Sequence, residues 1–231
     1  MMNGKIVSTK SMSWFAMPAD PQDPMQHIGL YSAFMEEIKL RTGAIDRYMA
    51  RFKTDAGAVD GFTDAESCIL QVRYICELIA LSSAAVHNLI GITSRIRDSY
   101  QPGMIFKLLE GSNKNSFPRA VTYGAGPASY EFNKGEMDLA ELKKVYNDCG
   151  ELLHRGALKH ALASNQREYA PEEILGWVNR IKALLNLHVV LMLDAGIVIL
   201  VTLSNENGEV QVALAQSDGP AILVEDDGAS A

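Results

Sequence analysis

A histidine and an arginine stand together at the predicted end of an amphipathic helix, in residues 145–156, VYNDCGELLHRG. The imidazole of His154 can act as a general acid or base, since the pKa of a free imidazole lies near neutrality. The guanidinium of Arg155 can bind a phosphate through two parallel hydrogen bonds. Basic side chains in the last turn also stabilise the carboxyl end of a helix. Acid–base chemistry on a phosphate ester and simple helix capping are therefore both open interpretations.

A polar line on the same helix would position this chemistry. Asn147 and His154 are seven residues apart, so a helix places them about 20° from alignment. Gly150 lies between them and has no side chain. Apolar residues occupy the rest of the helix surface, which puts Asn147 and His154 at the border of a buried stripe. Asn147, His154 and Arg155 are accordingly the candidate catalytic residues.

The spacing in residues 146–154, YNDCGELLH, resembles a degraded form of the signature of the HEPN superfamily of helical proteins, in which an arginine precedes a histidine. Cys149 stands at the arginine position, while His154 matches. The resemblance implies a homodimer with an RNA-directed role, either binding or metal-independent cleavage, because the arginine and histidine of HEPN ribonucleases form the catalytic pair across a dimer. A second register, from Arg155 to His160, keeps the arginine-to-histidine spacing but contains a glycine.

Two further strings, RYICELIAL at residues 73–81 and CGELLHRG at residues 149–156, resemble a group of uncharacterised bacterial and phage-associated proteins of similar length. With the HEPN resemblance, this implies a role in bacterial defence or stress.

Arg73 and Glu77 lie four residues apart on what should be the most buried helix, and a charge in a protein core needs a partner. Either the two residues pair with each other, or Glu77 reaches His154 or Arg155 and fixes the imidazole tautomer. Both are candidate supporting residues. His87, on the same helix, is expected to be a hydrogen-bonded core histidine more often than a site residue.

The net charge restricts nucleic-acid binding to a local surface. The 231 residues include 21 Lys and Arg against 28 Asp and Glu, a formal net charge of −7, which argues against a general basic coat. Residues 93–120 are nevertheless net positive. Arg95, Arg97 and Lys107 are therefore the candidate nucleic-acid contacts.

The cysteine and histidine patterns favour a reducing cytoplasm and neither a metal nor a cofactor. The 3 Cys have no paired spacing, and the 5 His contain no zinc-binding motif. The N-terminus lacks the apolar core of a signal peptide. Two apolar stretches, residues 75–92 and 189–203, contain polar or charged residues and are expected to be core and not membrane spans.

Apolar periodicity predicts helices over residues 27–52, 63–89 and 171–187. Capping boxes at Thr63 and Asp138 should begin two helices, and Gly156 should end the second in the left-handed conformation. Residues 111–135 are expected to form a long loop with minor strands. Runs over 188–193, 197–203 and 210–216 predict a three-stranded antiparallel meander.

We therefore expect a mainly α (α+β) protein, a bundle of about five helices followed by a β meander. The leading hypothesis is an RNA-directed, HEPN-like homodimer. The alternative is a non-enzymatic protein–protein interaction module, in which the meander offers an edge to a partner. The expected divisions are a flexible lead-in over residues 1–24, the bundle over 25–187, the meander over 188–218 and an acidic tail over 219–231.

Overall fold

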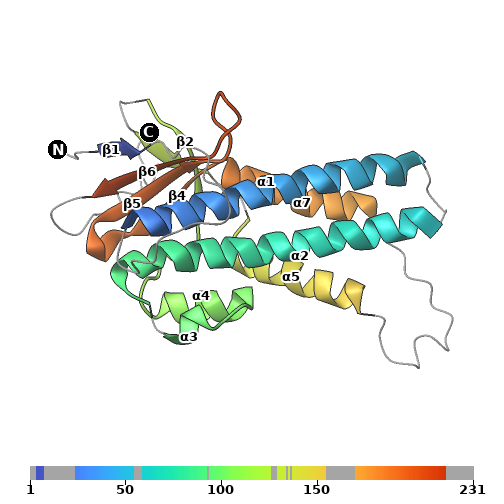
Figure 1. Ribbon diagram of the computed structural model, residues 1–231, viewed down its shortest axis with the longest axis horizontal. Coiled ribbons are helices and arrows are strands. Elements are labelled where there is room, and N and C mark those ends of the chain that lie inside the picture. Colours follow the sequence, from blue (N-terminus) through green and yellow to red (C-terminus); the bar gives the residue numbers. More distant parts are fainter. Residues whose placement is uncertain are drawn as a thin grey trace, which may run out of the picture.

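The computed structural model describes residues 4–7, 24–54, 59–92, 94–125, 129–133, 135, 137–154 and 170–216. The fold is mainly helical with an antiparallel sheet. Two long helices, α1 (Pro24–Thr54) and α2 (Val59–His87), run antiparallel along the molecule, and the sheet lies beside one end of the pair (Figure 1). The predicted α+β class is confirmed.

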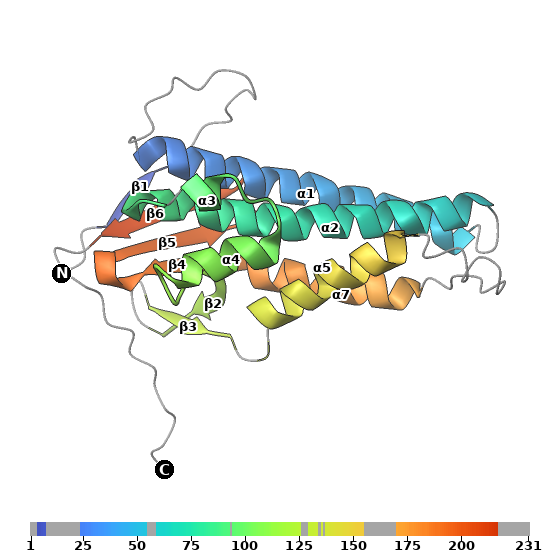
Figure 2. The ribbon, with the colours of Figure 1, turned by 90° about the horizontal axis from the view of Figure 1, so that it is seen from below.

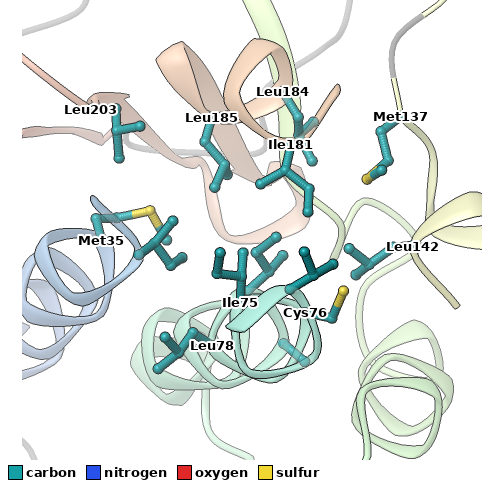
Figure 3. Packing of buried hydrophobic residues seen from close by; sticks show 14 of the residues in the cluster. Met35, Ile75, Cys76, Leu78, Met137, Leu142, Ile181, Leu184, Leu185 and Leu203 are labelled. Atoms are coloured by element: carbon teal, nitrogen blue, oxygen red, sulfur yellow. The ribbon is translucent and has the colours of Figure 1, made fainter. Parts of the chain in front are cut away.

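Shorter helices pack around α2, the centre of the bundle. They are α3 (Ser94–Arg97), α4 (Pro102–Glu110), α5 (Leu139–Leu153) and α7 (Pro171–Asn186), with 3-10 turns at Asn88–Ile90 and Leu193–Ala195. Residues 75–86 of α2 are buried on nearly every side, as their all-round apolar character predicted. Figure 3 shows Ile75 and Cys76 packed toward Ile181 of α7 and Leu142 of α5.

The start of α2 differs from the prediction. The helix begins at Val59, so Thr63 lies inside it and does not cap it. An ion pair joins the facing ends of the two long helices, with Nη2 of Arg51 2.7 Å from Oδ1 of Asp64. Contact with α1 supports this additional turn, whereas the capping pattern reports only local hydrogen bonding.

Helix α5 begins where the sequence indicates. Asp138 is its N-cap, and its Oδ1 accepts a hydrogen bond from the Glu141 N–H at 2.8 Å. The Glu141 carboxylate pairs with Arg180 of α7 and so ties α5 to that helix. The helix ends at Leu153 with an extended residue at His154. The predicted stop at Gly156 lies outside the described residues.

The three predicted meander strands form, as β4 (Leu187–Met192), β5 (Ile197–Thr202) and β6 (Gln211–Gln216). They are the middle of a larger sheet, because β1 (Gly4–Val7) pairs with β6 while β2 (Arg119–Tyr123) and β3 (Tyr130–Phe132) extend it beyond β4. The strand order is β1-β6-β5-β4-β2-β3. The predicted meander is therefore present but is only part of the sheet, and strands pair with both of its outer members. The edge strands are β1 and β3.

The two faces of the sheet bury different clusters. Val190 and Met192 of β4 belong to the main core that the helices fill. The alternating residues Leu187, Val189 and Leu191 belong to a second, smaller cluster, as expected for a strand whose side chains point to opposite faces. This is why all six residues of β4 are buried, and why His188 is its only polar residue.

Within the described chain, one helical stretch, Thr63–Ile90, has the length and apolar composition of a membrane span, and most of it is buried inside the fold. Core helices share these properties with membrane spans, so the cytoplasmic location remains a prediction.

Candidate functional site

Helix α5 presents the predicted polar line at its surface. Its apolar side packs against α2 through buried residues that include Val145 and Cys149. Asn147 and His154 are exposed, while Gly150 is buried. Lys143 lies one turn before Asn147. We call Lys143, Asn147, Gly150 and His154 the α5 line.

Arg73 from α2 extends across α5 and occupies the space above Gly150. A Cβ on Gly150 would lie only 2.7 Å from Nη1 of Arg73, closer than a carbon and a nitrogen can approach. Helix α5 therefore tolerates the guanidinium only because residue 150 has no side chain. A glycine in a helix costs about 1 kcal/mol relative to alanine, and here it makes room for a cation.

The guanidinium is fixed by two hydrogen bonds, a cation–π contact and an ion pair. Nη2 of Arg73 donates to the Tyr146 hydroxyl at 2.6 Å, and Nη1 donates to the Tyr146 carbonyl at 3.4 Å. The centre of the guanidinium lies 4.0 Å from the centroid of the Tyr146 ring, a cation–π arrangement. Nε lies 3.7 Å from Oε1 of Glu77, and the Tyr146 hydroxyl donates to the same Oε1 at 3.2 Å. We call Arg73, Glu77 and Tyr146 the Arg73 clasp.

The clasp keeps part of the cation available. The Arg73 side chain is 28% exposed, and that of Glu77 is 23% exposed. An arginine has five N–H donors, and one on each of Nε, Nη1 and Nη2 is directed at Glu77 or Tyr146. One N–H remains on each Nη nitrogen, so the guanidinium can still donate to an anion at the surface.

Burial sets the chemistry of the neighbouring groups. It raises the pKa of the Tyr146 phenol, an effect that the Arg73 charge opposes and the Glu77 charge reinforces. Burial also raises the pKa of the Cys149 thiol to about 12, again against the Arg73 charge. A thiol of this kind stays protonated near neutrality and is a poor nucleophile. Cys149 therefore contributes packing, and the cation beside it comes from α2.

The supporting residues follow the simpler of the two expectations. Arg73 and Glu77 pair with each other. The described partners of Glu77 are Arg73 and Tyr146, and they do not include His154. Arg155 and His160 lie outside the described residues, so neither the predicted phosphate ligand nor the second register is placed.

The candidate nucleic-acid contacts lie at the opposite end of α5 from His154. Arg95, Arg97 and Lys107 are all exposed on α3 and α4. Both views place these helices near the start of α5, while its end at Leu153 points away from them (Figures 1 and 2).

Lys143 connects the two regions. Its Cγ and Cε atoms lie 3.9 Å from the position that a Cβ on Gly103 would occupy, so its stem lies against the first turn of α4. Tyr100, which precedes α4, is 67% exposed. Tyr100 and Tyr146 were not predicted from the sequence to be site residues. An aromatic residue within the basic stretch was the available signal for Tyr100, whereas nothing local marks Tyr146 as the partner of Arg73.

His87 is a buried core histidine. Its Nδ1 lies 2.6 Å from the Ser83 carbonyl, and its Nε2 lies 2.7 Å from the side-chain nitrogen of Asn113. A carbonyl only accepts, so Nδ1 donates and the neutral ring accepts from Asn113. Burial lowers the pKa of His87, although the bond to Ser83 opposes the shift.

His188 repeats this arrangement and was missed by the sequence analysis. Its Nδ1 donates to the Leu185 carbonyl at 2.9 Å, and its Nε2 accepts from the Tyr31 hydroxyl at 2.6 Å. Burial lowers the pKa of this imidazole to about 4. Both histidines are therefore neutral structural groups near pH 7.

A cavity of about 240 Å³ lies beside the His87 network. Its lining residues are Ile90, Ser112, Asn113, Met192, Asp194 and Ala195. The Asn113 amide already donates to His87 and to the Leu191 carbonyl and accepts from the Asn115 N–H. The hydrogen-bonding groups of the Asn113 side chain are therefore largely occupied by other residues of the fold. Among the described residues, no three His, Cys, Asp or Glu side chains gather as metal ligands.

Comparisons of the chain with protein-family models, curated proteins and solved structures find no match.

Proposed function

We propose that this protein is an RNA-directed, HEPN-like protein whose site is the carboxyl end of the α5 line, with a role in bacterial defence or stress. The observation that carries the proposal is the position of Arg73, whose guanidinium lies on Gly150, one turn before the exposed His154. Cys149 replaces the arginine that the HEPN signature has in this turn. A cation is nonetheless present there, supplied by α2.

The roles follow from the chemistry of the two groups. Arg73 donates its remaining N–H groups to a phosphate of the RNA. His154 acts as a general base on the neighbouring 2′-hydroxyl, whose oxygen then attacks the phosphorus while the bond to the 5′-oxygen breaks. The 5′-oxygen leaves with a proton from an acid or from water. Asn147 lies on the same line and can hydrogen-bond the substrate. Two copies of the chain pair, as the family resemblance implies.

The test is cleavage of labelled single-stranded RNA over a pH series, with molar mass measured by light scattering on the same samples. We expect His154→Ala to abolish cleavage and Arg73→Ala to reduce it. The control is Lys144→Ala, because Lys144 is on α5 but pairs with Asp148. Wild-type protein that neither binds nor cleaves RNA contradicts the proposal, as does a His154→Ala variant that matches wild type throughout.

A second candidate function is a protein–protein interaction module, and the β2–β3 hairpin favours it. Tyr123 is 72% exposed, and its ring centroid lies 5.6 Å from that of Tyr130, which is also exposed. Tyr130 is on the edge strand β3, where a partner strand can add to the sheet. On this alternative a second copy docks at β3, and replacing Tyr123 and Tyr130 by serine reduces a dimeric molar mass to that of a monomer, with no RNA phenotype in any variant.

A further inference from the structure

Tyr100 is an exposed aromatic residue in the basic segment that contains Arg95, Arg97 and Lys107. We propose that the surface around it binds single-stranded RNA, with one unpaired base stacked on the Tyr100 ring and phosphates on the flanking cations. The inference rests on the proposed function and extends its site from the end of α5 to the start of α4. Stacking on an exposed aromatic ring is a sequence-tolerant way to hold a base, because every base has a flat face.

Charge is the first argument. Arg95 and Arg97 lie in α3, before Tyr100, and Lys107 lies in α4, after it. The acidic residues of residues 94–110 are Asp98 and Glu110, so the segment is net positive in an acidic chain. None of these three cations forms an ion pair with another described residue. Cations that no carboxylate of the protein neutralises can bind the phosphate groups of a nucleic acid.

Position is the second argument. The short helix α3 is anchored by buried Ile96, and α4 by buried Ile105 and Phe106. These anchors leave Tyr100 and Lys107 on the outside. Met104 is 38% exposed and shares the outer side of α4 with Lys107, three residues on. The outer side of α4 therefore carries an apolar side chain as well as a cation.

Continuity with the α5 line is the third argument. Lys143 lies against Gly103, three residues after Tyr100 in the first turn of α4. From Lys143 to His154 the helical rise amounts to about 16 Å. A short single strand can therefore contact Tyr100, Lys143 and the end of α5 together.

The experiment measures the affinity of a short labelled single-stranded RNA by fluorescence anisotropy at low and at moderate salt. Tyr100→Ala should weaken binding about 5- to 150-fold, the range for loss of one base stack. Tyr100→Trp should retain binding, and RNA should quench the added indole fluorescence. Tyr123→Ala is the matched control, since Tyr123 is a tyrosine of similar exposure, 72%, on β2. Circular dichroism establishes that each variant is folded.

The outcomes separate this inference from the proposed function. If wild-type protein binds RNA and Tyr100→Ala binds it equally well, the stacking site is wrong while the α5 site stands. If Tyr100→Ala and Tyr123→Ala weaken binding equally, the Tyr100 surface is also wrong. Preserved binding by His154→Ala together with lost binding by Tyr100→Ala supports the surface as the strand-binding part. Absence of RNA binding by the wild type overturns both proposals.

Discussion

Replacing Gly150 by alanine tests directly whether the Arg73 guanidinium lies over residue 150. The added Cβ would lie 2.7 Å from Nη1 of Arg73, so the guanidinium must move. The neighbouring atom is the end of a flexible side chain, which means that α5 stays in place and the clasp opens. On helix propensity alone, Gly→Ala should stabilise the protein by about 1 kcal/mol. The two effects have opposite signs.

The magnitude follows from the contacts that would be lost. The bond from Nη2 of Arg73 to the Tyr146 hydroxyl involves a charged donor, and such bonds contribute about 1.5–3 kcal/mol. The cation–π contact adds about 0.5–1 kcal/mol. Because Arg73 is 28% exposed, water compensates part of the loss. We take the loss as about 2 kcal/mol, and the propensity gain leaves a net destabilisation of about 1 kcal/mol.

Urea unfolding measures this change, and Gly176→Ala is the matched control. Gly176 is also inside a helix, α7, but a Cβ there meets no atom within 4 Å. It should stabilise the protein by roughly 0.5–1 kcal/mol. In an Arg73→Ala background, Gly150→Ala should become stabilising as well. If Gly150→Ala stabilises the otherwise wild-type chain as much as Gly176→Ala does, the Arg73 guanidinium does not lie over residue 150.

Three further predictions concern stability. The folded-state pKa of His188 is about 4, below the unfolded value of about 6.5, so the free energy of unfolding should fall by up to about 3 kcal/mol as the pH drops from above 6.5 to 4. Urea titrations at several pH values should show that the free energy of unfolding depends less steeply on pH in His188→Asn. An equally steep dependence in this variant would contradict the assignment. Asp138→Ala removes the N-cap of α5 and should cost about 1 kcal/mol in urea unfolding, whereas no measurable loss would mean that the cap is dispensable. Gly196→Ala places a Cβ on a residue with a φ of 64° in the turn before β5. It should lower the free energy of unfolding by about 1 kcal/mol and the melting temperature by a few degrees. An unchanged melting temperature would count against backbone strain at this residue.

Local patterns identified most of the elements, and they failed where distant contacts decide. The apolar periods of α1 and α7 and the β-branched runs of β4 to β6 matched the structure closely, because each of these elements buries one continuous apolar surface. Strand β1 has four residues and no strong pattern, and it exists by pairing with β6. The start of α2 likewise depends on contact with α1. Neither partner can be inferred from a short sequence window.

In the candidate site, too, local spacing predicted some side-chain positions, whereas contacts between distant residues were not predicted. The exposure of Asn147 and His154 followed from helical spacing, and the pairing of Arg73 with Glu77 followed from their separation of four residues. The contact between Arg73 and Tyr146 spans 73 residues of sequence and has no local signature.

Gly150 links the two parts of the site. A glycine in the middle of an amphipathic helix is unfavourable in isolation, and the sequence analysis treated it as a gap in the polar line. In the fold it is the position where a side chain from α2 crosses α5. If the proposed HEPN-like function holds, Cys149 at the arginine position and Gly150 next to it have one structural meaning, since the cation above this turn comes from α2. The proposal therefore requires the cation at this position, and Gly150→Ala tests that requirement because it moves the guanidinium of Arg73 without removing its charge.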